Sequence, residues 1–347
     1  MLLEGVHIPL TTPFYPDGKL NLRKLEHNVD RYSRTPAAGM VVLSSIGEPE
    51  TLSDVETRET LATALGAAGE TKVMIAGIAC GSVATALDLV GFVATAGYDA
   101  VLVKRPALLG EGQLRETVTF FQAVADRSPI PVILDSASLA SLAAEAVAEL
   151  SSHSNVIGLF DGDTSVARIE QVRAATSTVK REAIVTTVFA AVTRRMLAVK
   201  EQAGAATFVA AESLGGGAAV ATAPPRPAIK TRTKAVGFQV VAASSAGMLA
   251  GLRAGAVGVM PAFAAAAPQA SYEVYAAWKD DDQPLADEKQ LRITSAIAQV
   301  EVELGVPGIR YASDLNGYFG GRPRLPLLPL TGPERAAVEQ VMDGIRN

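Results

Sequence analysis

Three polar side chains stand where short apolar runs of the chain end, and all three are residue types that do chemistry. They are Lys104 after 100–103, Asp135 after 132–134 and Asp161 after 156–160. In a parallel α/β protein the carboxyl ends of the strands carry the reacting groups. A buried lysine could be a nucleophile, and carboxylates could transfer protons or bind a divalent ion. The structural alternatives are a surface lysine beside Arg105 and aspartates that only end strands or, as at Asp163, cap a helix.

Hydroxyl groups and one further carboxylate lie in the loops that follow the first two apolar runs. Thr11 and Thr12 follow the first run, and Ser44, Ser45 and Glu48 follow the second. Thr11, Thr12, Ser44 and Glu48 are candidate substrate contacts, as is Phe160 at the end of the apolar run 156–160, and Ser45 is a candidate catalytic hydroxyl. We expect Glu48 either to hydrogen-bond the loop backbone or to act as a general base.

The sequence contains no recognisable metal or cofactor motif. The spacings between His7, His27 and His153 match no zinc-ligand pattern. Gly215–Gly217 neither follows a buried strand nor opens a helix, so a flexible turn is expected there and not a phosphate cradle. We therefore expect neither a metal ion nor a cofactor.

The elements that must position the candidate residues alternate along most of the chain as strand and helix. Strands are predicted at 5–10, 39–43, 72–78, 100–103, 132–134, 156–160, 238–242 and 257–260. Helical patterns separate them, and Ser53 with Glu56 forms a capping box at the start of one helix. Eight such units predict a closed (β/α)8 TIM barrel. An open doubly wound sheet would carry a glycine-rich fingerprint after the first strand, which Thr11-Thr12-Pro13 is not.

The alternation breaks between about 178 and 237, which predicts an insertion into a barrel that spans 1–280. An apolar stripe over Val188–Val199 predicts an amphipathic helix in this segment. Runs at 207–211 and 218–222 predict a hairpin. Residues 281–347 carry helical patterns and are expected to form a C-terminal helical extension.

A basic run follows the prolines of the predicted insertion. It consists of Arg226, Lys230, Arg232 and Lys234. Such a run is typical of a solvated face, but it could also form a lid that holds an anionic substrate.

The bulk composition excludes several classes of function. The 347 residues are 49% hydrophobic and carry a formal net charge of −5, so a large core is supplied and non-specific nucleic-acid binding is disfavoured. No uninterrupted apolar run is long enough to span a membrane, and the start of the chain lacks the pattern of a signal peptide. The single cysteine, Cys80, fits a reducing compartment. We expect a cytoplasmic protein with no nucleic-acid or membrane partner.

Four motifs, in order along the chain, resemble those of the dihydrodipicolinate synthase/N-acetylneuraminate lyase family. They are Gly5–Phe14, Ser44–Glu48 in place of the family's G-T-T-G-E loop, Ile75–Ile78, and Gly317–Leu330. The resemblance spans most of the chain outside the predicted insertion. It implies a TIM barrel, a lyase or aldolase that acts on a small oxo-acid, and a homo-oligomer that is a dimer or a tetramer.

The chain departs from the family at the residues that carry its chemistry. Phe160 stands where those enzymes have the lysine that forms a Schiff base with pyruvate, and a phenyl ring cannot attack a carbonyl. The two family tyrosines correspond to Asp135 and Leu108, and the loop threonines to Ser45 and Ile46. Three hypotheses remain open. They are a family-type lyase in which another residue replaces the lysine, an oxo-acid enzyme that uses no Schiff base, and a catalytically silent barrel that binds a ligand or acts as an oligomer partner.

We predict that the protein does not condense pyruvate with aspartate semialdehyde. Losing a nucleophile together with its proton relay removes orders of magnitude in rate. A steady-state synthase assay of the purified protein, run beside an authentic synthase, is the measurement. Turnover at an ordinary enzyme rate, about 1 per second or more, would contradict the prediction.

Overall fold

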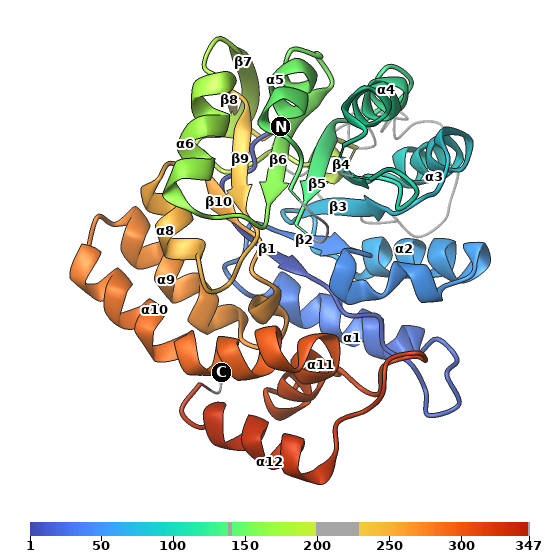
Figure 1. The fold of residues 1–347 in the computed structure, drawn as a ribbon, viewed down its shortest axis with the longest axis vertical. Coiled ribbons are helices and arrows are strands. Elements are labelled where there is room, and N and C mark those ends of the chain that lie inside the picture. Colours follow the sequence, from blue (N-terminus) through green and yellow to red (C-terminus); the bar gives the residue numbers. More distant parts are fainter. Residues whose placement is uncertain (111, 138–140, 199–228, 346–347) are drawn as a thin grey trace, which may run out of the picture.

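A closed barrel of eight parallel strands forms the centre of the molecule (Figure 1). The computed structural model describes residues 1–110, 112–137, 141–198 and 229–345. The barrel strands are β1 Gly5–Pro9, β2 Gly39–Val42, β3 Val73–Ile78, β4 Ala100–Lys104, β5 Val132–Ser136, β6 Val156–Asp161, β9 Gln239–Ala242 and β10 Gly258–Val259. All eight coincide with the strands that the apolar runs predict, and the TIM-barrel prediction is confirmed.

Helices surround the barrel and continue beyond its last strand. Those that follow barrel strands are α1 Leu22–Ser33, α2 Asp54–Ala67, α3 Val83–Ala96, α4 Leu114–Ala125, α5 Ala144–Ser151, α6 Val166–Ala175, α8 Met248–Arg253 and α9 Pro268–Lys279. The C-terminal part contains α10 Gln283–Ile297, a π-helical turn Ala298–Glu303, α11 Gly305–Leu315 and α12 Gly332–Val341. The capping box of Ser53 and Glu56 is present at the start of α2.

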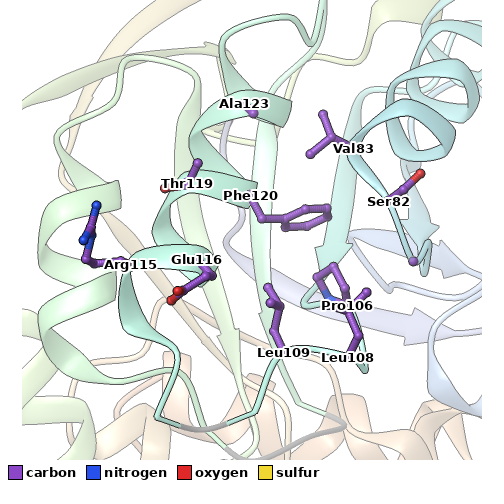
Figure 2. A pocket seen from close by; sticks show the side chains of 11 residues that line it. Ser82, Val83, Pro106, Leu108, Leu109, Arg115, Glu116, Thr119, Phe120 and Ala123 are labelled. Carbon is purple, nitrogen blue, oxygen red and sulfur yellow. The ribbon is translucent and has the colours of Figure 1, made fainter.

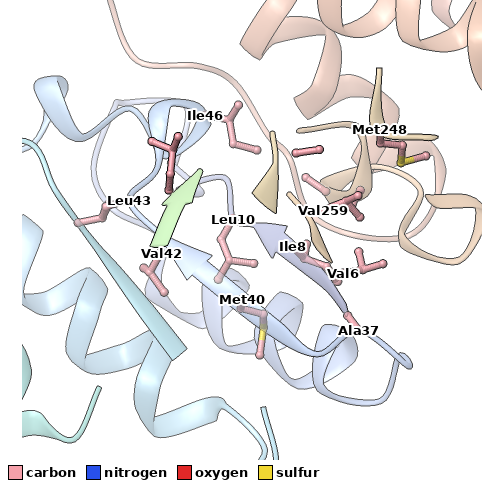
Figure 3. Packing of buried hydrophobic residues seen from close by; sticks show 14 of the residues in the cluster. Val6, Ile8, Leu10, Ala37, Met40, Val42, Leu43, Ile46, Met248 and Val259 are labelled. Carbon is pink, nitrogen blue, oxygen red and sulfur yellow. The ribbon is translucent and has the colours of Figure 1, made fainter. Parts of the chain in front are cut away.

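The buried side chains form two layers because successive residues of a strand face opposite sides. The outer layer, between strands and helices, includes Val6, Ile8 and Met40 and is shown in part in Figure 3. The inner layer fills the barrel, and Leu102, Ile133 and Phe160 belong to it. The barrel interior is therefore a packed core and not a pore.

Sequence reasoning missed α11, because its first turn contains Gly305, Pro307 and Gly308, which are poor helix residues. Proline is tolerated there since the N–H groups of a first turn have no partner within the helix. The helix matters because it carries Arg310, whose side chain is completely buried.

A hairpin of β7 Arg181–Thr186 and β8 Thr231–Val236 lies outside the barrel and covers its amino-terminal face. The guanidinium of Arg181 donates to the carbonyls of Ser151 and His153, each at 2.6 Å, just before β6. Ala183 and Val185 pack with Leu2, just before β1. The opposite face of the barrel, where the strands end, is thus left to the loops that follow the strands.

Two predictions about this segment need correction. The chain is in β7 until Thr186, and Val188 lies in the following turn with 79% of its side chain exposed, so the predicted amphipathic stripe is wrong at its start. Lys234 pairs with Glu4 at the amino-terminal face, and Arg232 lies on the same strand. Neither cation forms a lid over the strand ends. Arg226, Gly215–Gly217, the hairpin predicted at 207–222 and Val199 lie outside the described residues.

Arg181→Met should destabilise the protein by about 1–3 kcal/mol, because buried carbonyls at the end of α5 and the start of β6 lose their donor. Urea unfolding followed by circular dichroism measures the free energy of unfolding. Arg232→Met is the matched control on the other strand of the hairpin, since Arg232 is exposed and should change stability by less than about 0.5 kcal/mol. Equal effects of the two substitutions would contradict the assignment.

Candidate active site

Lys104, Asp135 and Phe160 lie side by side at the carboxyl end of the barrel. In the strand register, Lys104 of β4 lies opposite Asp135 of β5, and Asp135 lies opposite Phe160 of β6. Leu102 and Ile133 face the barrel interior, so Lys104 and Asp135, two residues further along, face the same side. One inward-facing layer therefore contains a cation, a carboxyl group and an aromatic ring on three adjacent strands.

The Lys104 ammonium is held by a carboxylate from the loop after β2. Its Nζ lies 2.5 Å from Glu50 Oε1, and 18% of the lysine side chain is exposed against 58% for Glu50. Glu50 belongs to the short 3-10 turn Pro49–Thr51. Sequence reasoning missed Glu50, because the pairing joins residues 54 positions apart and only the closed barrel brings them together.

Asp135 is the buried acid of this layer. It is 8% exposed, and its Oδ1 accepts a hydrogen bond of 2.9 Å from the backbone N–H of Ala137. Burial raises its pKa to about 6, against a smaller lowering by the Ala137 N–H and by Lys104, while Glu50 adds to the rise. A carboxyl group with this pKa can both accept and donate a proton near neutral pH.

Phe160 is completely buried within the barrel interior. Its ring centroid lies 5.8 Å from that of His7, which is also completely buried. Burial lowers the pKa of His7 to about 4, so its imidazole is neutral at physiological pH. The side of the layer next to Asp135 is therefore apolar.

Asp161, a candidate acid or metal ligand, faces away from this layer. Its carboxylate accepts from Arg168 Nε at 2.8 Å, from the Ser136 hydroxyl at 3.2 Å and from the Asp163 N–H at 3.2 Å. Strand alternation is the reason, because the residue after an inward Phe160 must face the helices. Asp161 therefore holds the loops after β5 and β6 in place through these hydrogen bonds. The described residues contain no cluster of three metal-ligating side chains.

Glu48 and Thr12 are tied into a buried network with the C-terminal helices. Arg310 Nε donates to Glu48 Oε1 at 2.7 Å, and its terminal nitrogen donates to the Thr12 carbonyl at 2.7 Å. The other oxygen of Glu48 accepts from the Arg324 N–H at 3.1 Å. The Thr12 hydroxyl donates to the Gly47 carbonyl at 2.6 Å. Both carboxylate oxygens of Glu48 are therefore used to hold its loop against the C-terminal part of the chain. The sequence alone gave no indication that Arg310 is its partner.

The remaining candidates lie in the loops above β1 and β2. Thr11 is 3% exposed, and Ser44 is 4% exposed with a hydroxyl that has no hydrogen-bond partner among the described residues. Ser45 is exposed at the start of the 3-10 turn Ser45–Gly47. Of the predicted set, the structure brings together Lys104, Asp135 and Phe160, and it places Asp161 and Glu48 in supporting networks.

A groove of about 460 Å³ opens between α3 and α4, next to the end of β4 (Figure 2). Its walls are mostly apolar, and Pro106, Leu109 and Phe120 point into it. Pro106 is two residues after Lys104, so the groove begins close to the layer described above.

Comparison with known proteins identifies the family. Residues 2–190 match the dihydrodipicolinate synthetase family. This chain belongs to that family. A 4-hydroxy-tetrahydrodipicolinate synthase of Exiguobacterium is 24% identical over 99% of this chain and 98% of its own length. That of Pseudoalteromonas atlantica is 29% identical, but the match covers 50% of this chain and 59% of the relative.

Solved structures agree on the fold. The dihydrodipicolinate synthase DapA-2 of Bacillus anthracis superposes with a TM-score of 0.77 at 18% identity, covering all of both chains. YagE of Escherichia coli K12, a family member solved in complex with pyruvate, superposes with a TM-score of 0.76 at 20% identity, covering 99% of each chain. The family membership supports a lyase-like barrel protein. In the described residues no helix has the length and hydropathy needed to cross a membrane.

Phe160→Ala should lower the free energy of unfolding by about 3–5 kcal/mol, because it opens a cavity in a fully packed barrel interior. Thermal and urea unfolding measure the loss. Phe189→Ala is the control at a half-exposed ring and should have a much smaller effect. An unchanged stability of Phe160→Ala would show that the ring is not packed in the barrel.

Proposed function

We propose that this protein is a lyase that acts on a small oxo-acid without a Schiff base, using Asp135 for proton transfer and Lys104 for charge stabilisation. The observation that carries the proposal is the inward-facing layer in which these two residues are neighbours in the register of β4 and β5, next to Phe160 on β6. Family membership supports the lyase class.

The charge on Lys104 argues against an imine at this residue. Its ammonium lies against Glu50 and close enough to Asp135 to affect the pKa of that carboxyl. An ammonium held in an ion pair has no lone pair with which to attack a carbonyl. Phe160, which the resemblance aligns with the family lysine, has no nucleophilic atom.

The same layer can cleave a carbon–carbon bond by acid–base chemistry. The Asp135 carboxylate accepts the proton of a hydroxyl group located β to the oxo group of the substrate. The carbon–carbon bond breaks, the hydroxyl carbon becomes an aldehyde, and the electron pair moves to the oxo oxygen as an enolate. Lys104 stabilises this enolate, as a preorganised charge does for a developing oxyanion. Asp135 then returns the proton to the enolate carbon.

The hydroxyl of Ser44 is a candidate to bind the carboxylate of the oxo-acid. It is buried and without a partner among the described residues, and Ser45 follows it. Buried polar groups are normally hydrogen-bonded, so a ligand oxygen would satisfy Ser44. Thr11 completes this set of proposed substrate contacts, and the homo-oligomer that the resemblance implies remains a prediction.

A catalytically silent, ligand-binding barrel is the second candidate. The specific observation in its favour is Phe160, because a fully buried ring in the catalytic layer makes that layer more apolar than acid–base chemistry requires. Binding of oxo-acids without turnover would favour it.

Asp135→Asn should lower kcat for cleavage of 4-hydroxy-2-oxo acids, followed as pyruvate release, by about 100-fold or more. In the wild type, kcat/KM should rise as pH increases through about 6, because Asp135 must be ionised to act as the base. Lys104→Met should also lower kcat, and it should move the rise of kcat/KM to a higher pH, because Lys104 lowers the pKa of Asp135. Asp163→Asn is the control, since Asp163 accepts only a turn hydrogen bond from the Ser165 N–H.

The same preparation tests for an imine. Mixing the protein with pyruvate and borohydride should leave its mass unchanged, because no amine of the layer forms a Schiff base. A stable adduct on Lys104, or full activity of Asp135→Asn, would overturn the proposed mechanism.

A further inference from the structure

Arg105 is a buried cation with no partner. It follows Lys104 at the end of β4 and is only 8% exposed. Among the residues that the structure describes, no hydrogen bond or ion pair involves its guanidinium, and its Nε is sealed from solvent without a partner. Burying a charged group without a partner is costly, so natural proteins rarely retain one that has no use.

The other buried arginines of this chain show the usual arrangement. Arg310 is held by Glu48 and two carbonyls. Arg168 is held by Asp161 and by the carbonyl of Leu142 at 2.7 Å. Arg105 differs from both, because no carboxylate or carbonyl among the described residues accepts a hydrogen bond from its guanidinium.

The nearby acids are already committed to other cations. Burial raises the pKa of both Asp135 and Asp161. Lys104 opposes the rise at Asp135 and Arg168 opposes it at Asp161, and Arg105 is not among the groups that shift either pKa. Glu50 pairs with Lys104. The counter-ion of Arg105 is therefore not one of the carboxylates around the catalytic layer.

The accessible part of Arg105 is the part that binds anions. Nε is sealed from solvent, but neither terminal nitrogen is both sealed and unpartnered, so the end of the fork touches solvent. The planar fork of a guanidinium suits two oxygens of a carboxylate or phosphate. Pro106, the next residue, lines the groove of Figure 2 between α3 and α4.

We propose that Arg105 binds a small oxyanion, a carboxylate or a phosphate, at the end of β4. Consecutive residues at a strand end face different sides, so Arg105 does not compete with Lys104 for the reacting group. The anion site is therefore separate from the proposed reaction site inside the barrel.

Equilibrium binding tests this assignment without relying on turnover. Titrating the wild type with inorganic phosphate, with succinate and with acetate at constant ionic strength should show binding of phosphate or succinate at least 10-fold tighter than acetate. Whichever of phosphate and succinate binds more tightly identifies the anionic group that Arg105 prefers. Arg105→Met should weaken that binding at least 10-fold, and Arg105→Lys should weaken it less.

The unliganded variants test whether Arg105 is structural. Arg105→Met should melt at the same or a higher temperature than the wild type without anion, because it removes an unpartnered buried charge. Arg127→Met, at an exposed arginine near the end of α4, is the control and should leave binding unchanged. The proposal is wrong if Arg105→Met binds the anion as the wild type does, if the wild type binds none of the probes, or if unliganded Arg105→Met and Arg105→Lys both melt several degrees lower. If the protein binds the anion but cleaves no oxo-acid, the anion site is supported and the proposed lyase function is wrong.

Discussion

The parallel pairing of β4, β5 and β6 is the constraint on which the candidate site depends. Backbone hydrogen bonds fix Lys104 opposite Asp135 and Asp135 opposite Phe160, and closure of the barrel turns all three side chains to the inside. A shift of one residue on any of the three strands would exchange an inward residue for one that faces the helices. Asp161 shows the consequence, since it is one residue beyond Phe160 and serves a different network.

The mixture of charge and apolar surface in this layer determines its chemistry. Asp135 on β5 lies between Lys104 on β4 and Phe160 on β6, and burial raises its pKa while Lys104 opposes the rise. A carboxyl in such surroundings titrates close to neutral pH, as a proton-transfer group must. The ion pair with Glu50 keeps the cation at the mouth, where a developing negative charge would need it.

The two ends of the barrel are closed by different parts of the chain. At the amino-terminal face, Arg181 of the hairpin caps carbonyls at the end of α5. At the carboxyl-terminal face, Arg310 of α11 joins Glu48 to the loop after β1. The C-terminal helices therefore support the loops that carry the proposed substrate contacts, while the hairpin supports stability at the face opposite the proposed chemistry.

The sequence by itself determined the strands, the barrel and the candidate residues at the strand ends, because apolar runs and turn residues are local signals. Alternation along β6 is also a local pattern, and it accounts for Phe160 on the inside of the barrel. Only the tertiary structure decided which candidates meet. Glu50 joins Lys104 across 54 positions and Arg310 joins Glu48 across 262, and no local pattern records such pairings. Only the folded chain likewise shows that Arg105 has no partner among the described residues, whereas the buried Arg168 and Arg310 have theirs.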